Sequence, residues 1–508
     1  MRCGNYRTVG MDPLNVSNQS SDKRARRMHA LKNTIFATLT SLSDVLLFAL
    51  LVVAGRLLGA ENFGIFNSAL ALTAILMFAT DLGLDNLAIR EISVDRSTGS
   101  KLMGSVLVWK TLAVMVILVV YLPIVYALWF DSPVAILVYL LCLAAILRSF
   151  NLTFRSFLHS YERFDIESVL VISERIATFL LGVLALWSGH GVIGLAVVFV
   201  VVRTGLFITY LLVIHLWVSP IILALRLREM LAFQIMALPL GIALIIRGIY
   251  LQADILLLSF LRTDAEVGLF SASFKIQEGL LVVSMIITHV MYPRLSEYFV
   301  HDRFRHHDYF YRMVKYLTIV SFPILAIGFL YSDEIILLLY GKDFATSGAV
   351  LAILLASLVF VFNSTALIVV LRSNGNQMSE MHILTLALLT KVVAGIALIP
   401  FFGIYGAAVA AMIAAAVMLV LAMIRLHQLD YKLTDMFKNI AKMAASTIII
   451  FLLILILPIS SLPVEMTVLC CLYLAAIFAF GLLDKYEKEV IMSLPPFRFL
   501  GSIFGSRS

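Results

Sequence analysis

Charged side chains interrupt two apolar segments near the middle of the chain. Residues 238–278 read LPLGIALIIRGIYLQADILLLSFLRTDAEVGLFSASFKIQE, and Arg247, Asp254, Lys275 and Glu278 lie in two predicted helices that meet at a turn over residues 261–266. A charge at the bilayer centre costs about 2.5–3.5 kcal/mol on insertion scales, so such residues usually face a partner or a water-filled cavity. A guanidinium there can bind an oxyanion with its planar fork of donors.

The composition places these charges in a membrane protein. Of 508 residues 62% are hydrophobic and 14% are charged, against about 25% charged in an average soluble domain. The net charge of +7 is typical of Lys and Arg in cytoplasmic loops, and no basic patch with interleaved aromatics predicts nucleic acid as a partner. The four cysteines form no disulfide framework and no metal-ligand spacing, so we expect no metal site.

Apolar runs of about 20 residues predict an all-α membrane protein with about fourteen transmembrane helices. Six lie near residues 33–55, 63–84, 103–126, 133–152, 168–188 and 193–216, and six more near 233–260, 267–292, 316–331, 347–371, 381–401 and 404–424; a last pair covers 440–459 and 464–483. The predicted parts are a polar cytoplasmic tail (1–30), a first lobe (31–218), a cytoplasmic linker (219–232), a second lobe (233–428), the C-terminal helix pair (429–483) and a cytoplasmic tail (484–508).

The loop charges predict the orientation, because Lys and Arg are retained on the cytoplasmic side. With the N-terminus inside, the outer loops hold only Arg56, Arg262 and Lys342, and six further bases are intramembrane, which leaves 29 of the 38 Lys and Arg on the inner side. We therefore expect a multi-pass protein of the cytoplasmic membrane with both termini in the cytoplasm.

Short matches relate the two sets of six helices. Residues 64–69 (GIFNSA) match 268–273 (GLFSAS) at an offset of 204 residues, and 191–196 (GVIGLA) match 403–408 (GIYGAA) at an offset of 212. Such echoes are typical of transporters built from repeats, and an even number of helices per half makes the repeats parallel. A tight turn that feeds a small-residue helix interface would produce the same matches without common ancestry.

The arrangement R..Y...D...LS followed by VGLFSAS.KI.E resembles polysaccharide flippases of the multidrug/oligosaccharidyl-lipid/polysaccharide exporter superfamily, at the start of their second half. Further resemblances in the same order are GRLLGAENFGIFN, ATDLGLDNLAIRE, FRSFLHSYERFD, MYPRLSE, YGKDFATSGAVLAIL and IPFFGIYGAAVAA. This resemblance implies two six-helix lobes around a central cavity, with a lipid-linked sugar as cargo. The C-terminal pair resembles that of fourteen-helix members, in which it can form a groove for the lipid tail.

We single out eleven ionisable residues inside the predicted helices. They indicate a hydrated, slightly cationic interior, because eleven lipid-exposed charges would cost roughly 30 kcal/mol. They are Asp44, Asp81, Lys110, Glu174, Arg175, Arg203, Arg247, Asp254, Lys275, Glu278 and Lys391. Asp81, Lys110 and the pair Glu174-Arg175 lie toward the cytoplasmic ends, where snorkelling or a local salt bridge would explain them. For the residues near mid-membrane, a place in the cavity and pairing between helices are both open; these are Arg203, Arg247, Lys391, Glu278 and Asp44.

The carriers of lipid-linked glycans, polyprenyl phosphate or pyrophosphate, present an oxyanion. We predict Arg247 as the first contact for a phosphate or acidic sugar, followed by Arg203, Lys275 and Lys391. Asp44, Asp254 and Glu278 would hold these bases in place, or one of them would carry a coupling proton or sodium ion.

Enzymatic function has no support in the motifs, since the chain contains no P-loop, GxSxG, HExxH or nucleotide fingerprint. We expect no cofactor and no direct use of ATP. The predicted function is a flippase that moves a lipid-linked oligosaccharide or polysaccharide precursor across the cytoplasmic membrane by alternating access. A multidrug or lipid II exporter of the same fold is the first alternative. A membrane glycan polymerase or ligase is the second, although every outer loop is short.

Overall fold

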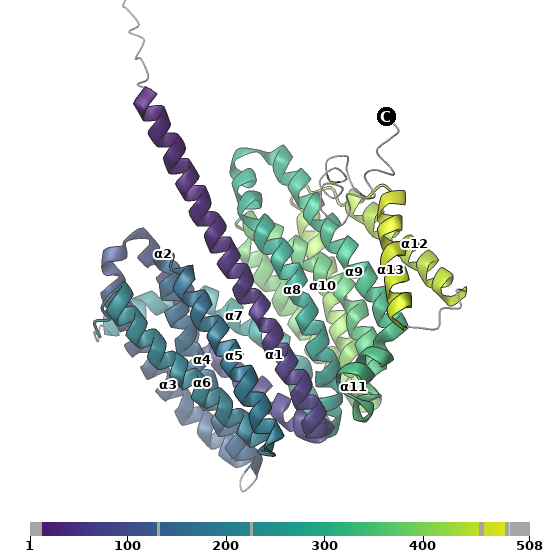
Figure 1. Cartoon of the computed structure of the whole chain (residues 1–508), viewed down its shortest axis with the longest axis horizontal. Helices are drawn as coiled ribbons and strands as arrows, with labels where there is room; N and C mark the ends of the chain where they lie inside the picture. Colours follow the sequence, from purple (N-terminus) through teal and green to yellow (C-terminus); the bar gives the residue numbers. More distant parts are fainter. Residues whose placement is uncertain (1–12, 130–132, 224–226, 457–461, 483–486, 488–508) are drawn as a thin grey trace, which may run out of the picture. The chain divides into compact units, whose positions relative to one another are not determined.

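The computed structural model describes residues 13–129, 133–223, 227–456 and 462–482, and Glu487. These residues are almost entirely helical and include no strand (Figure 1). Among them eleven helices are long and apolar enough to cross a membrane. The predicted all-α membrane architecture is confirmed, whereas the number of fourteen helices stays a prediction. The first twelve residues of the predicted N-terminal tail, and the predicted C-terminal tail apart from Glu487, lie outside the described residues.

The α-helices follow one another along the chain with short connections. They are α1 Pro13–Asp81, α2 Leu84–Val94, α3 Gly99–Trp129, α4 Pro133–Ser160, α5 Phe164–Trp187, α6 Gly191–Val213, α7 Leu227–Leu261, α8 Asp264–His301, α9 Arg303–Leu339, α10 Ser347–Ser373, α11 Gln377–His427, α12 Thr434–Ile456 and α13 Leu462–Ala479.

Two of these helices contain a glycine at which the backbone leaves the helical conformation. Gly59 interrupts α1 with φ 74°, and Gly403 interrupts α11 with φ 56°. Both glycines lie where the sequence predicts a turn between two helices, and a left-handed φ costs glycine little because it has no Cβ.

The chain divides into two compact units. The first contains Met1–Leu51 and Thr73–Leu244, and the second contains Val52–Leu72 and Ile245–Ser508. Its boundaries are not those of the predicted lobes, which stay a prediction: the later boundary falls inside α7, and the second unit includes a middle segment of α1 and the predicted C-terminal helix pair. Both α1 and α7 therefore contribute residues to both units.

An aromatic cluster forms the core of the first unit. Phe154 on α4 stacks on Tyr210 on α6 with 5.9 Å between the ring centroids, and Phe157 and Val106 are buried in the same cluster. Side chains of α2, α3, α4 and α6 meet there, so this cluster sets the positions of the helices that carry the unit's charges.

In the second unit α8, α9 and α10 pack side by side (Figure 1). The segment of α1 in this unit approaches α8 through glycines: a Cβ on Gly64 would lie 1.7 Å from the carbonyl oxygen of Asp264, and one on Gly268 would lie 1.8 Å from that of Ala60. The two backbones are therefore in direct contact, as is typical of helix interfaces with small residues. Gly64 and Gly268, the first residues of the repeated stretches GIFNSA and GLFSAS, thus lie next to each other.

The turn between α7 and α8 lies where the sequence predicts it. Thr263 and Glu266 form a capping box at the start of α8, which satisfies two backbone donors of the helix end. Arg262 donates to the carbonyl oxygens of Ile399 (3.1 and 2.9 Å) and Pro400 (2.8 Å). This arginine therefore ties the turn to α11, next to the Gly403 kink.

Candidate functional site

Lys391 on α11 and Asp254 on α7 form a buried ion pair in the second unit. The Lys391 Nζ lies 2.6 Å from the Asp254 Oδ2 and donates to the Tyr250 carbonyl oxygen at 3.0 Å. It also lies 4.4 Å from the centroid of the Tyr250 ring. Only 4% of Lys391 and 2% of Asp254 are exposed. Each charge is neutralised by the other, so both residues are engaged in holding α7 to α11.

Lys275 and Glu278 pair within α8. The Lys275 Nζ lies 2.7 Å from the Glu278 Oε2, and 47% of the Glu278 side chain is exposed. The ammonium also lies 5.7 Å from the centroid of the Phe274 ring. The spacing of three residues on one helical face makes this contact local.

Arg247 on α7 is exposed and, within the part of the chain that the structure describes, forms no ion pair. Its charge interacts with those of Arg372 and Glu380, which are themselves paired, with 3.0 Å between the Arg372 Nε and the Glu380 Oε2. The charges of both arginines also act on His289. Arg247 thus presents an uncompensated guanidinium in a locally cationic environment.

In the first unit Arg203 on α6 is 8% exposed and likewise has no carboxylate partner among the described residues. Its guanidinium carbon lies 5.0 Å from the centroid of the Phe199 ring. The charges that act on it are those of Arg148, Arg175 and Glu174. Arg175 pairs with the half-exposed Asp44 on α1, with 2.9 Å between Nη2 and Oδ1. Within the described residues the charge of Glu174 therefore acts on Arg203 without forming an ion pair with it.

Arg148 is a site residue that sequence reasoning missed. It lies inside the predicted helix 133–152 but was not among the ionisable residues singled out there, and α4 continues beyond residue 152 to Ser160. Arg148 therefore lies three turns from the helix end, among the charges of Arg175, Glu174 and Asp44. The polar but helix-compatible residues after 152 were the signal that the helix continues.

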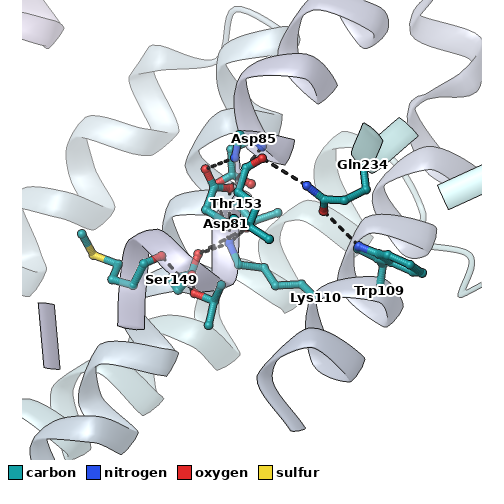
Figure 2. A network of polar contacts seen from close by, with 11 residues as sticks. Asp81, Asp85, Trp109, Lys110, Ser149, Thr153 and Gln234 are labelled. Atoms are coloured by element: carbon teal, nitrogen blue, oxygen red, sulfur yellow. Dashed lines mark hydrogen bonds and ion pairs between the residues drawn. The ribbon is translucent and has the colours of Figure 1, made fainter. Parts of the chain in front are cut away.

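Lys110 on α3 is fully buried and does not snorkel (Figure 2). Its Nζ donates to the Ser149 carbonyl oxygen at 2.9 Å and to the Thr153 Oγ1 at 2.6 Å. The Asp81 Oδ1 and the Asp85 Oδ2 each lie 3.7 Å from it. Of the two explanations open for Lys110 and Asp81, the local salt bridge is the one observed, and Asp85 is a further member that the sequence did not single out.

A comparison with models of protein families shows to which family the chain belongs. The family model described as "Polysaccharide biosynthesis protein" matches residues 30–299, more than half of the 508 residues. The chain belongs to the polysaccharide biosynthesis protein family. The part that matches this family includes Arg203, Arg247 and the Lys110 cluster, whereas Lys391 lies beyond it.

Solved structures show the fold of this polysaccharide biosynthesis family member. "Lipid II flippase MurJ, inward closed conformation" superimposes with a TM-score of 0.71 at 13% identity, over 90% of this chain and 100% of that one. An inward-facing multidrug resistance MATE family transporter of the MOP superfamily superimposes with a TM-score of 0.61 at 14% identity, over 81% of this chain and 98% of that one. A MOP superfamily transporter from Pyrococcus furiosus has a TM-score of 0.56 at 15% identity, over 79% of this chain and 95% of that one. No curated protein sequence matches the chain. The expected superfamily fold is confirmed.

Proposed function

We propose that this protein is a flippase that carries a lipid-linked oligosaccharide or polysaccharide precursor across the cytoplasmic membrane by alternating access. Its family supports a role in polysaccharide biosynthesis. Its fold is that of transporters, one of which is a lipid II flippase, and this favours transport over catalysis. Both termini lie in the cytoplasm in this proposal, as the distribution of loop bases predicts.

The observation that carries the proposal is the contrast among the intramembrane bases. Lys391, Lys275 and Arg175 each have a carboxylate partner, whereas Arg203 and Arg247 have none among the described residues. A guanidinium without a counter-ion in an apolar protein needs an anion or water. A phosphate or pyrophosphate oxyanion would be bound by such a group through charge-assisted, bidentate hydrogen bonds.

A lipid II exporter is the second candidate, because the most similar fold reported above is that of a lipid II flippase. Its cargo presents the same phosphate chemistry and differs in the sugar. The two unpaired arginines therefore fit both cargoes, and only the glycan separates the two candidates.

The test is reconstitution into proteoliposomes with three cargoes: a polyprenyl-pyrophosphate oligosaccharide, lipid II and a cationic dye. Arrival of each lipid-linked cargo in the opposite leaflet is measured with an impermeant enzyme that acts on its sugar. We expect the oligosaccharide carrier to flip fastest, and without ATP. Preferential flipping of lipid II would favour the second candidate. Transport of the dye without flipping of either phosphate-linked lipid would overturn both.

A further inference from the structure

The turn between α1 and α2 brings two carboxylates to one buried ammonium (Figure 2). Asp81 ends α1 and Asp85 lies in the first turn of α2, and both carboxylates are 3.7 Å from the Lys110 Nζ. The other residues around them are Ser149 and Thr153 on α4 and Gln234 on α7. Asp81 and Lys110 are the charged groups that act on Asp85. The cluster, with both acids ionised, has an excess of one negative charge.

One oxygen of this cluster has no partner. The Asp85 Oδ1 is buried and accepts no hydrogen bond from the described residues, and the residue as a whole is 8% exposed. Two like charges in a buried site strongly disfavour each other, so one of two neighbouring carboxylates tends to take up a proton. A metal ion would need several oxygen ligands at once, but Lys110 already occupies the Ser149 and Thr153 oxygens. A single proton fits this site.

The same cluster fixes the geometry of the turn. The Asp81 carboxylate accepts hydrogen bonds from the backbone N–H groups of Gly83 and Asp85, each at 3.2 Å. Leu82 and Gly83 have φ values of 44° and 84°, and the left-handed region is unfavourable for a leucine. The carboxylate of Asp81 thus stabilises a turn in which the conformation of Leu82 is unfavourable.

This turn packs directly against the backbone of α7. A Cβ on Gly83 would lie 2.7 Å from the Ala237 carbonyl oxygen, and one on Gly241 would lie 2.3 Å from that of Leu82. Gln234 donates to the Leu82 carbonyl oxygen at 3.1 Å and accepts from the Trp109 Nε1 at 3.0 Å (Figure 2). A change in the conformation of the turn would therefore alter its contacts with residues 234–241 of α7.

Helix α7, against which the turn packs, has residues in both units. Residues of α7 up to Leu244 belong to the first unit, and those from Ile245 onward, including Arg247 and Asp254, belong to the second. Pro239 lies inside the helix between Gln234 and Gly241, and a proline removes one backbone hydrogen bond and allows a bend.

We propose that Asp81, Asp85 and Lys110 form a site for one proton, and that its occupancy changes the packing of the Leu82–Gly83 turn on α7. The site would couple a proton gradient to the movement of cargo. This coupling rests on the proposed flippase function and adds the ion and its site. Proton binding itself can be measured without cargo.

The first experiment is infrared difference spectroscopy of the purified full-length protein between neutral and acidic pH. We expect a carbonyl band from a buried protonated carboxyl group that disappears in Asp85→Asn or Asp81→Asn and persists in Asp435→Asn, which alters a carboxylate whose side chain is 62% exposed. Lys110→Gln removes the ammonium and should strengthen the band. A band that survives in both Asp85→Asn and Asp81→Asn would overturn the site. The fluorescence emission of Trp109, assigned with the Trp109→Phe variant, should change over the same pH range as the infrared band if the packing of the turn on α7 changes.

The second experiment imposes a pH gradient on proteoliposomes, with the acidic side where the cargo arrives. One exchanged proton changes the accumulation ratio about tenfold per pH unit. We expect the wild-type protein to show this dependence. In the Asp85→Asn variant we expect flipping to continue only until the cargo is equally distributed between the two leaflets. Gradient-driven accumulation by Asp85→Asn would refute the coupling. Absence of flipping by the wild type would count against the flippase proposal and leave the infrared result standing.

Discussion

Asp254 on α7 and Lys391 on α11 are 137 positions apart in the sequence, and their charged atoms are 2.6 Å apart. Arg247 shares a helical face with Asp254, two turns away, and could have been its counter-ion. Lys391 fills that role, and Arg247 forms no ion pair within the described residues. The two basic residues therefore have different surroundings, and mutations can separate the roles proposed for them.

Breaking the Asp254–Lys391 pair should destabilise the protein. We expect Asp254→Asn or Lys391→Met to lower the free energy of unfolding by about 3–5 kcal/mol, because each leaves a lone buried charge. The double variant should regain most of this loss, since both charges leave together. Thermal unfolding in detergent measures the effect. If the double variant is less stable than either single variant, the pair contributes through contacts other than its charges.

Substitution of Arg247 should impair transport and leave stability unchanged. A hydrogen bond to a charged group contributes about 1.5–3 kcal/mol, so Arg247→Gln should reduce flipping of a phosphate-linked cargo by roughly 10- to 100-fold. Arg247→Lys should restore only part of the activity, since an ammonium keeps the charge but loses the bidentate fork. Lys438→Gln on α12, which changes an exposed base paired with Asp435, is the control. Equal rates for Arg247→Gln and the control would show that Arg247 does not contact cargo.

Local periodicity predicted part of this site. Lys275 and Glu278 could be placed on one face of one helix from their spacing alone, and they are paired. Partners on distant helices could not be found this way, because one sequence does not say which helices pack together. Lys391 and Asp254 illustrate this limit, as do Arg175 and Asp44, which are 131 positions apart.

Hydropathy located the membrane helices but not their ends. The turns at Gly59 and Gly403 fall at predicted boundaries, because glycine and a fall in hydropathy coincide there. At its C-terminal end α4 continues through polar residues to Ser160, beyond the predicted end at residue 152. The role of Asp85 was hidden, since its partner Lys110 comes from another helix.

A methyl group on Gly268 should separate α8 from the segment of α1 in the second unit. The added Cβ would meet the Ala60 carbonyl oxygen at 1.8 Å, and both partners are backbone that cannot rotate away. We expect Gly268→Ala to cost about 1–3 kcal/mol, as overpacking does, measured by thermal unfolding. Gly205→Ala on α6, where no atom lies within 4 Å, should be neutral or slightly stabilising because alanine favours a helix. Two variants of equal stability would contradict the close backbone contact.

Labelling of single cysteines tests the predicted orientation of the chain. The native cysteines are first replaced, and new ones are introduced at four exposed positions, Glu61, Lys342, Ser97 and Gln377. Because the loop bases place the first two outside and the other two inside, an impermeant thiol reagent added to intact cells should label the Glu61→Cys and Lys342→Cys variants. The Ser97→Cys and Gln377→Cys variants should react only after the membrane is permeabilised, which also controls for accessibility. The opposite pattern would invert the topology, and with it the direction in which cargo is carried.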